Sequence, residues 1–366
     1  MLATVTSASL HGIDGLLVRV EVDSTRGLPY FAVVGLPDAA VCESRERILA
    51  AIRNLGFQVP LRRLTVNLAP AGIRKEGAAF DLPIAIGVLI ASEQLRPAES
   101  IAMAGELSLD GSVKPIRGAL VIAGAVRAAG IERLVVPSAN AGEAALVGEL
   151  KVFGVSQLDE AARLVERLGT PAEPAPARPQ CAPEPIRRTL DLADVVGQAH
   201  AKRALEIAAA GGHNLLLIGP PGGGKTMLAR RLPGILPPLA LAEAITATQI
   251  ASVAGVLPPG AGLLRERPFR APHHTISTAG LVGGGQPVRP GEASLAHHGI
   301  LFLDELPEFR RTTLEVLRQP MEEGSITIVR AAGATSYPAR FSLVAGSNPC
   351  GCVAHFRRFQ LRWGCS

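Results

Sequence analysis

The feature that most constrains this chain is a glycine-rich loop followed directly by a lysine and a threonine. The loop fits the spacing G-x-x-x-x-G-K-[ST] and consists of Gly219, Pro220, Pro221, Gly222, Gly223, Gly224, Lys225 and Thr226. It follows the apolar run 215–218 and precedes the helix-like segment 227–231. In this context backbone N–H groups turn inward around a polyphosphate, the lysine reaches the β- and γ-phosphates and the threonine holds Mg²⁺. The alternative is a glycine-rich turn before an unrelated lysine, and the flanking strand and helix favour the nucleotide site.

Length and composition limit the class of protein to which this chain can belong. A chain of 366 residues exceeds one ordinary core and predicts two or three domains. Its hydrophobic fraction of 48% and charged fraction of 19% are typical of a folded globular protein. The net charge of +5 is compatible with a nucleic-acid partner without requiring one.

Cysteine usage and the apolar segments bear on location. Five cysteines are an odd number, which does not suggest a secreted disulfide framework. The N-terminus lacks the basic flank and apolar core of a signal peptide. The longest apolar run, 82–92, is too short to span a bilayer. We therefore expect a cytoplasmic protein with no membrane partner.

Residues 1–168 have the pattern of an α/β domain. Apolar and polar residues alternate over 18–22 and 64–68, as in half-buried strands. Between them Asp38 is placed to cap a helix that ends at Gly56. Further strand and helix patterns follow.

Two stretches of this front domain, 75–81 and 105–116, resemble the proteolytic domain of Lon-type proteases, which has a ribosomal S5 domain 2-like fold. In that family the first stretch carries a catalytic serine and the second leads to a lysine that activates it. The serine position is Ala79 here, and the lysine position is near Leu120. The resemblance thus implies a proteolytically inactive domain that serves binding or assembly.

Proline marks the boundary between the two domains. Residues 169–189 contain six prolines, namely Pro171, Pro174, Pro176, Pro179, Pro183 and Pro185. Proline disfavours the interior of helices and sheets, so we predict a semi-rigid linker. The second domain then covers 190–350.

The second domain contains carboxylates placed for phosphate chemistry. The buried-strand pattern 300–303 ends in Asp304 and Glu305. A carboxylate at a strand end beside the loop can organise Mg²⁺, and a second one can polarise the attacking water. The alternative is a strand that ends in a solvated acidic turn.

Two further segments complete the predicted nucleotide site. Residues 191–198 and the helical pattern after them resemble the segment that flanks adenine in AAA+ ATPases, which points to Val196 and Gly197. Asn348 follows a strand pattern at the position of sensor 1 in those proteins, next to the γ-phosphate. An asparagine before proline is also a common turn cap.

Two histidine pairs, His273–His274 and His297–His298, raise the question of a metal site. Neither pair has the spacing of a metal-binding motif, and adjacent side chains point apart on a helix or strand. The spacing favours structural hydrogen bonding.

Six segments together resemble the magnesium-chelatase-like AAA+ family, in its ComM/YifB branch. They are 267–275, 289–292, 294–299, 303–309, 317–322 and 337–341. The Lon-like front domain, which the magnesium-chelatase ATPase subunit lacks, favours that branch.

The resemblance implies an α/β protein with an AAA+ core built on a parallel sheet, using ATP and Mg²⁺. It implies hydrolysis coupled to DNA handling, as branch migration or helicase activity in natural transformation and recombination, by a homo-oligomeric, hexameric ring. Thr226 and Asp304 would hold Mg²⁺, Glu305 would be the catalytic base and Asn348 would contact the γ-phosphate. A hairpin within 315–340 would face the pore, with Arg330 and Arg340 available for phosphates. The alternatives are a metal-insertion ATPase subunit and a nucleotide-binding interaction protein without motor activity.

The end of the chain departs from the family pattern. Gly351 replaces a proline, and the sequence after Cys352 does not continue into the arginine finger, sensor 2 or lid. We therefore expect an incomplete core, an atypical tail over 351–366 and poor ATP hydrolysis. Cys350, Cys352 and Cys365 do not make a four-thiolate zinc site by themselves.

Overall fold

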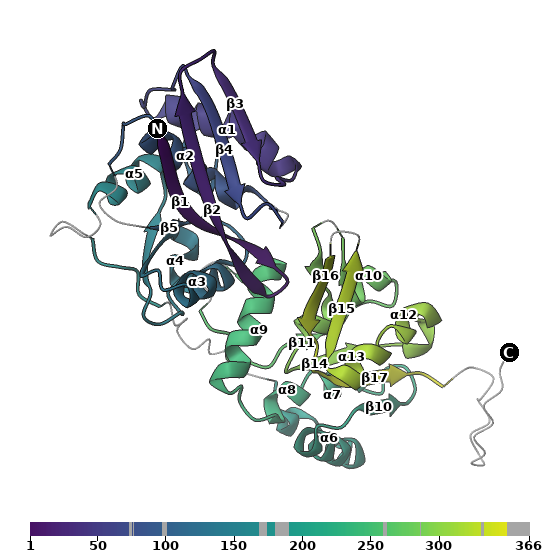
Figure 1. Ribbon diagram of the computed structural model, residues 1–366. Coiled ribbons are helices and arrows are strands. Elements are labelled where there is room, and N and C mark those ends of the chain that lie inside the picture. Colours follow the sequence, from purple (N-terminus) through teal and green to yellow (C-terminus); the bar gives the residue numbers. More distant parts are fainter. Residues whose placement is uncertain are drawn as a thin grey trace.

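Two α/β units lie end to end in the computed structural model (Figure 1). The residues that the structure describes are 1–72, 75, 77–96, 101–167, 174–179, 190–258, 262–285, 287–330 and 333–349. We call residues 1–167 the front unit and residues 190–349 the second unit. Of the predicted linker only 174–179 is described, and there Ala177 N donates to Val152 O at 2.7 Å. The predicted tail, 351–366, lies outside the described residues.

The front unit is built on a seven-stranded mixed sheet with the order β3-β4-β2-β1-β5-β8-β9. Its strands are β1 (Leu2–His11), β2 (Asp14–Thr25), β3 (Tyr30–Val34), β4 (Arg63–Ala69), β5 (Ala102–Met103), β8 (Arg133–Pro137) and β9 (Lys151–Val155). The neighbours β1–β2 and β2–β4 are antiparallel, and the other neighbours are parallel. The alternation that predicted strands over 18–22 and 64–68 is confirmed, because Val18, Val20 and Val22 all face the core.

Helices cover this sheet. They are α1 (Ala39–Asn54), η1 (Ala78–Phe80), α2 (Asp81–Ala91), α3 (Ala119–Ala128), α4 (Ser138–Ala144) and α5 (Leu158–Arg167), and a short ribbon pairs β6 (Glu106–Leu107) with β7 (Val113–Lys114). Asp38 caps α1 as expected, since its carboxylate accepts from Val41 N at 2.9 Å. Every residue of α2 is buried. Each large apolar side chain buried there contributes about 1.5–3 kcal/mol. Among the described residues no helix has the length and hydropathy needed to cross a membrane.

The second unit contains a four-stranded sheet in which all neighbours are parallel, with the order β10-β17-β14-β11. The strands are β10 (Leu215–Ile218), β11 (Phe269–Arg270), β14 (Ile300–Leu303) and β17 (Ser342–Ser347). All four residues of β14 are buried. Parallel strands end at one edge of the sheet, and ligands of open α/β sheets bind at that edge.

The helices of the second unit are mostly short. They are η2 (Leu192–Asp194), α6 (Ala199–Gly211), α7 (Lys225–Ala229), α8 (Leu232–Ile235), α9 (Leu241–Ala254), α10 (Thr278–Val282), α11 (Glu292–Leu295), η3 (Leu306–Glu308), α12 (Arg311–Glu315) and α13 (Arg318–Glu323). Two antiparallel ribbons complete the unit, β12 (Gly283–Gly284) with β13 (Arg289–Pro290) and β15 (Ser325–Arg330) with β16 (Gly333–Pro338). The second ribbon lies where the sequence predicts a hairpin within 315–340.

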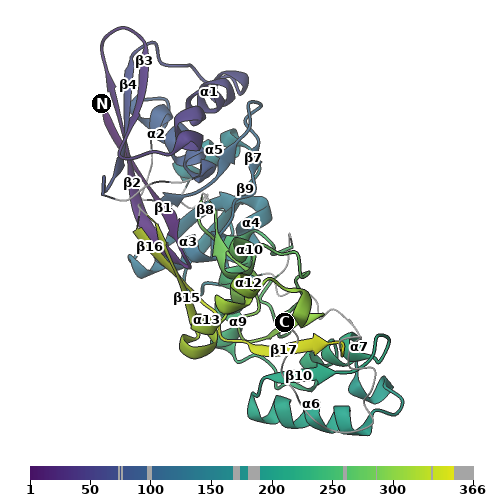
Figure 2. The ribbon, with the colours of Figure 1, turned by 90° about the vertical axis from the view of Figure 1, so that its right-hand side faces the viewer.

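The two units meet along α9 and the β15–β16 ribbon. Ser252 Oγ on α9 donates to the buried carboxylate of Glu143, and Gly118 N donates to Ser252 O at 3.2 Å. Figure 2 shows the turn between β1 and β2 beside β16, where Tyr337 is 1% exposed and packs with Leu10. The contact between the units is therefore both apolar and hydrogen-bonded.

Candidate nucleotide-binding site

The glycine-rich loop connects β10 to α7 at the carboxyl edge of the parallel sheet, as the sequence predicts. Gly222 and Gly224 have φ of +77° and +79°, a conformation that glycine adopts without strain. A Cβ atom built at Gly219 or Gly222 would meet no atom within 4 Å. The loop therefore has open space on that side, which fits the bulk of a polyphosphate.

Lys225 reaches back over the loop. Its Nζ donates to Gly219 O at 2.8 Å, to Pro220 O at 3.0 Å and to Asn348 Oδ1 at 2.7 Å. All three acceptors are neutral, whereas phosphate oxygens carry negative charge and would add the attraction between opposite charges. The same contact brings Asn348, at the end of β17, to the loop.

Thr226 and Asp304 meet across the sheet. Thr226 Oγ1 donates to Asp304 Oδ2 at 2.6 Å, although β10, which leads into the loop before Thr226, and β14, which ends before Asp304, are separated by β17. On β17, Gly346 lies against Asp304, because a Cβ atom there would lie 2.7 Å from Asp304 Oδ1. The missing side chain thus leaves room for the carboxylate. A hydroxyl and a carboxylate in contact are the oxygen donors that Mg²⁺ prefers in phosphate sites, so these two residues fit the predicted metal site.

Glu305 directly follows Asp304 but has a different environment. Its backbone φ is +53°, its side chain is 52% exposed and its Oε2 lies 3.7 Å from His274 Nδ1. Its backbone N–H donates to Asp304 Oδ1 at 3.0 Å. The structure therefore places Glu305 at the same edge of the sheet as Asp304, with a carboxylate that water can reach.

The segment predicted to flank adenine lies beside the loop. Gln198 Nε2 donates to Gly223 O at 3.4 Å, and Arg231 Nε donates to Asp191 O at 2.9 Å. Val196 is 96% exposed. An exposed apolar side chain next to a phosphate-type loop is suited to contact a flat base. The two residues that the sequence indicated, Val196 and Gly197, are thus near the loop but make no contact that tests their role.

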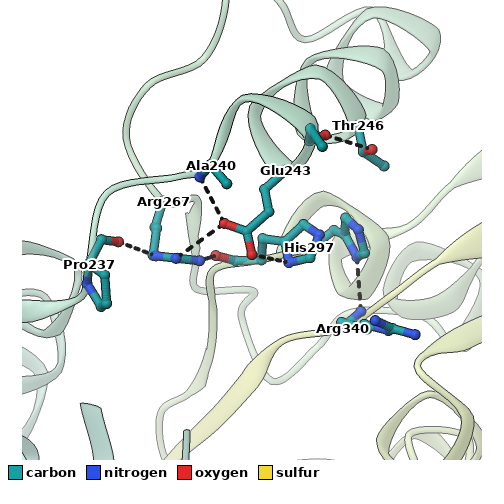
Figure 3. A network of polar contacts seen from close by, with 9 residues as sticks. Pro237, Ala240, Glu243, Thr246, Arg267, His297 and Arg340 are labelled. Carbon is teal, nitrogen blue, oxygen red and sulfur yellow. Dashed lines mark hydrogen bonds and ion pairs between the residues drawn. The ribbon is translucent and has the colours of Figure 1, made fainter. Parts of the chain in front are cut away.

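The histidine pairs make hydrogen bonds and close contacts with protein groups. His297 Nδ1 accepts from Arg340 N at 3.0 Å, and His298 Nδ1 lies 3.4 Å from Glu243 Oε1. Glu243 Oε2 also accepts from Ala240 N at 3.0 Å (Figure 3). Among the described residues, no three His, Cys, Asp or Glu side chains are grouped so that they could hold a metal ion.

Burial decides the charge of this network. Desolvation, followed by the nearby charges of His298 and Arg340, lowers the pKa of His297 to about 4. The pKa of Glu243 is lowered as well, first by the hydrogen bond from Ala240 N. His297 is therefore neutral at physiological pH, and Glu243 is an ionised cap of α9.

The sequence analysis gave no role in this site to Arg231, His274 or Gly346, and it named Gln198 only as part of the segment 191–198. The contacts of all four residues depend on distant segments. Only His274 carried a local signal, as one of two adjacent histidines before the acidic strand.

A parallel sheet that brings a G-x-x-x-x-G-K-[ST] loop to a strand-end carboxylate defines a P-loop core. For the second unit a family model supports an AAA+ core, since residues 191–362 match "Magnesium chelatase, subunit ChlI". In the front unit, residues 20–140 match "Subunit ChlI of Mg-chelatase". The chain belongs to the magnesium-chelatase-like family of the ComM/YifB type.

Two relatives illustrate this. YifB of Salmonella typhimurium is 45% identical over 350 residues, covering 95% of this chain and 68% of the relative. Competence protein ComM of Haemophilus influenzae is 45% identical over 357 residues, covering 95% and 69%. The similarity runs through both units.

The chain has a second, weaker relationship. Lon protease 2 of Bacillus subtilis is 30% identical over 97 residues, which is 26% of this chain and 17% of that protein. This supports the Lon-like relationship expected from 75–81 and 105–116. The positions that we aligned with the Lon serine and lysine, Ala79 and Leu120, lie in η1 and α3 and carry no nucleophile or base.

Proposed function

We propose that this protein binds Mg²⁺·ATP at the glycine-rich loop and hydrolyses it to drive the handling of DNA. The observation that carries the nucleotide part is the Thr226–Asp304 hydrogen bond of 2.6 Å, which joins the loop to the acidic strand across β17. An isolated glycine-rich turn would have no reason to meet a strand-end carboxylate. The contact therefore favours a phosphate and metal site over a simple turn.

Each residue has a role that its position allows. Lys225 would exchange neutral acceptors for the β- and γ-phosphate oxygens, and Asn348, which is in contact with Lys225, would contact the γ-phosphate. Thr226 and Asp304 would hold Mg²⁺, which when bound neutralises charge that develops on the phosphates. The exposed carboxylate of Glu305 would orient and deprotonate the attacking water.

Nucleotide binding is tested by Lys225→Ala. The change removes one charge-assisted contact to the phosphates, worth about 1.5–3 kcal/mol, so the affinity for Mg²⁺·ATP should fall about 10- to 100-fold. Lys114→Ala, at an exposed lysine on β7 of the front unit, is the matched control. Titration calorimetry measures both. Unchanged affinity in the Lys225 variant would refute the proposed site.

The DNA part rests on the second unit's ribbon and on the family. Val329 at the end of β15 is 74% exposed, and Arg330 beside it is exposed as well. An exposed ribbon that ends in arginine can contact backbone phosphates, and the chain carries a net charge of +5. We include in the proposal a cytoplasmic, hexameric ring with this ribbon toward the pore.

DNA binding has its own test. Arg330→Glu should weaken duplex binding and reduce the dependence of affinity on salt concentration by about one counterion. Arg127→Glu, at an arginine of the front unit, is the control. Fluorescence anisotropy at several salt concentrations measures how duplex affinity depends on salt in each variant. The same salt dependence in Arg330→Glu and in the control would contradict a contact between the ribbon and DNA.

Metal insertion is the second candidate, because the family model for residues 191–362 bears the magnesium-chelatase name. ATP hydrolysis stimulated by DNA supports the DNA motor. Hydrolysis that responds only to a porphyrin and a chelatase partner supports metal insertion. Binding of ATP without any hydrolysis would identify a nucleotide-binding interaction protein.

A further inference from the structure

A cavity of about 490 Å³ lies where the two units meet. The front unit contributes the end of β1, η1 and the segment that follows β7, and the second unit contributes parts of α9, β13 and β16. The described residues that line it include none of the glycine-rich loop 219–226. Ligand sites in proteins typically measure about 300–1,000 Å³. The cavity thus has the size of a ligand site and is separate from the nucleotide site.

One wall of the cavity is a strand edge. Met1 and Ser24 exchange both of their backbone hydrogen bonds, at 2.7 and 3.1 Å, and along an antiparallel pair such exchanges occur at every second residue. The even-numbered residues of β1 therefore direct their N–H and C=O groups away from β2. On that side β5 pairs with β1 at Thr6 alone. The backbone groups of Ala8 and Leu10, which line the cavity, lie beyond the end of this ladder.

A buried hydroxyl without a partner lines the same cavity. Ser9 is 3% exposed, and its Oγ has no hydrogen-bond partner among the described residues. Leaving a buried hydroxyl unsatisfied lowers stability. Ser7, two residues earlier on β1, is fully buried and also lacks a partner in the described part of the chain, but it does not line the cavity. A ligand in the cavity would therefore reach the hydroxyl of Ser9 and not that of Ser7.

The charges around the cavity favour an anionic group. Arg117 and Arg289, one from each unit, are exposed lining residues, and neither is hydrogen-bonded or ion-paired with a described residue. The two acidic lining residues are already engaged. The carboxylate of Asp38 accepts two backbone N–H groups, at 2.9 and 3.0 Å, and Glu106 has a favourable electrostatic interaction with Arg47. The charge that is left to pair is positive.

We propose that this cavity binds an extended peptide segment of another protein, which adds as a short strand to the edge of β1 and places an acidic side chain against Arg117 and Arg289. In complexes of this kind the backbone hydrogen bonds to the strand edge give affinity, and surfaces for alternate side chains give specificity. The bound segment would also supply a partner for the Ser9 hydroxyl. The inference does not depend on the proposed ATPase function.

The cavity matches such a segment in length and surface. The edge 8–11 accommodates about four residues, at roughly 3.3 Å each. Ile116, Val253 and Val288 provide apolar surface for alternate side chains of the peptide. Ala79 lines the cavity with a methyl group and offers no nucleophile. We therefore expect the peptide to be bound and not cleaved.

The first test varies the peptide and leaves the protein unchanged. The probe is a fluorescein-labelled pool of pentapeptide amides, with aspartate at the third position and valine, threonine or leucine elsewhere, and fluorescence anisotropy measures its affinity for the full chain. Two further pools carry N-methyl groups on one or the other set of alternate backbone nitrogens. Only one set faces β1, so the affinities of these two pools should differ about tenfold or more.

Equal affinities of the two methylated pools would overturn the proposal, because apolar contact alone does not distinguish the two edges of a peptide. Absence of binding of the unmethylated probe up to about 1 mM would overturn it as well. Displacement of the probe by an equal concentration of glutarate would assign the cavity to small dianions and contradict a peptide site.

The second test changes the charges of the cavity. Arg117→Gln and Arg289→Gln should each weaken binding of the aspartate probe about three- to tenfold, the scale of a contact to a charged group at an accessible site. A pool with asparagine in place of aspartate should bind both variants and the wild-type chain equally. Arg62→Gln, at an exposed arginine outside the cavity, is the matched control. The same affinity for the aspartate probe in all three variants would overturn the proposal.

The two serines separate a ligand contact from an effect on stability. Ser9→Ala and Ser7→Ala each remove a buried hydroxyl that lacks a partner, so both should raise the Tm of the chain without peptide. Only Ser9→Ala should also weaken binding of the probe, by about threefold. Equal affinity of the probe for the two variants would contradict the contact between Ser9 and the peptide.

A second copy of this chain is the competing occupant of the strand edge. Sedimentation velocity with and without the probe distinguishes the two. An oligomeric state that the probe leaves unchanged supports a peptide from another protein. Dissociation of an oligomer by the probe would assign the edge to contact between copies and overturn the proposal.

Discussion

The buried histidine before β14 gives a prediction whose size follows from the structure. His297 is 4% exposed, and its Nδ1 accepts the backbone N–H of Arg340 at 3.0 Å. Burial first, and then the charges of His298 and Arg340, lower its pKa from 6.5 to about 4, while Glu243 opposes them. Protonation would place a charge in the core and remove the acceptor from the Arg340 N–H.

The direction in which stability changes with pH follows from proton linkage. The pKa of His297 is lower in the folded chain than in the unfolded chain, so protons bind preferentially to the unfolded chain between pH 6.5 and about 4. Its contribution to stability is complete above pH 6.5 and is lost as the pH falls toward 4. One pH unit corresponds to about 1.4 kcal/mol. Remaining solvent contact screens the group, so we expect about 2 kcal/mol over this range.

The variant His297→Asn isolates this effect. The amide Oδ1 takes the position of Nδ1 and can accept the Arg340 N–H, but it does not titrate. Hydrogen exchange of the β14 amides, corrected for intrinsic rates, gives the free energy of opening at pH 7.5 and 4.5. Wild type should lose about 2 kcal/mol more than the variant between these pH values. Equal losses would refute the assignment of a buried neutral histidine.

Two further changes test the packing around the site and between the units. Gly346→Ala places a methyl group only 2.7 Å from Asp304 Oδ1, so we expect the carboxylate to move away from Thr226. The affinity for Mg²⁺·ATP, measured by calorimetry, should then fall about tenfold. Glu143→Ala removes the carboxylate that accepts from Leu120 N at 3.1 Å and from Ser252 Oγ. The free energy of unfolding, measured by urea titration, should therefore fall by about 2–4 kcal/mol.

Conservative variants serve as controls for these two changes. Gly124→Ala lies on α3, where a Cβ atom meets nothing within 4 Å, and should leave nucleotide affinity unchanged. Glu143→Gln keeps one carbonyl acceptor and should cost less than Glu143→Ala. A Gly346→Ala protein with wild-type affinity would contradict the close packing of Asp304, and equal stability of Glu143→Ala and wild type would contradict the interface bond.

Local patterns in the sequence were sufficient for the elements that carry the site. The spacing of glycines and lysine predicted the loop between β10 and α7, the Asp38 cap predicted the start of α1, and the apolar run before Asp304 predicted β14. Each of these depends on a few adjacent residues, because capping, periodicity and turn conformation act over short distances.

Only the tertiary structure decided which of these elements meet. The order β10-β17-β14 places the strand that ends before Asn348 between the loop strand and the acidic strand, and it brings Gly346 against Asp304. Strand order and register arise from long connections and from packing on both faces of a sheet, which no local pattern encodes. Thr226 and Asp304, 78 residues apart, are in contact for that reason. The sequence supplied the side chains that we propose for ATP and Mg²⁺, and the parallel sheet brings them together.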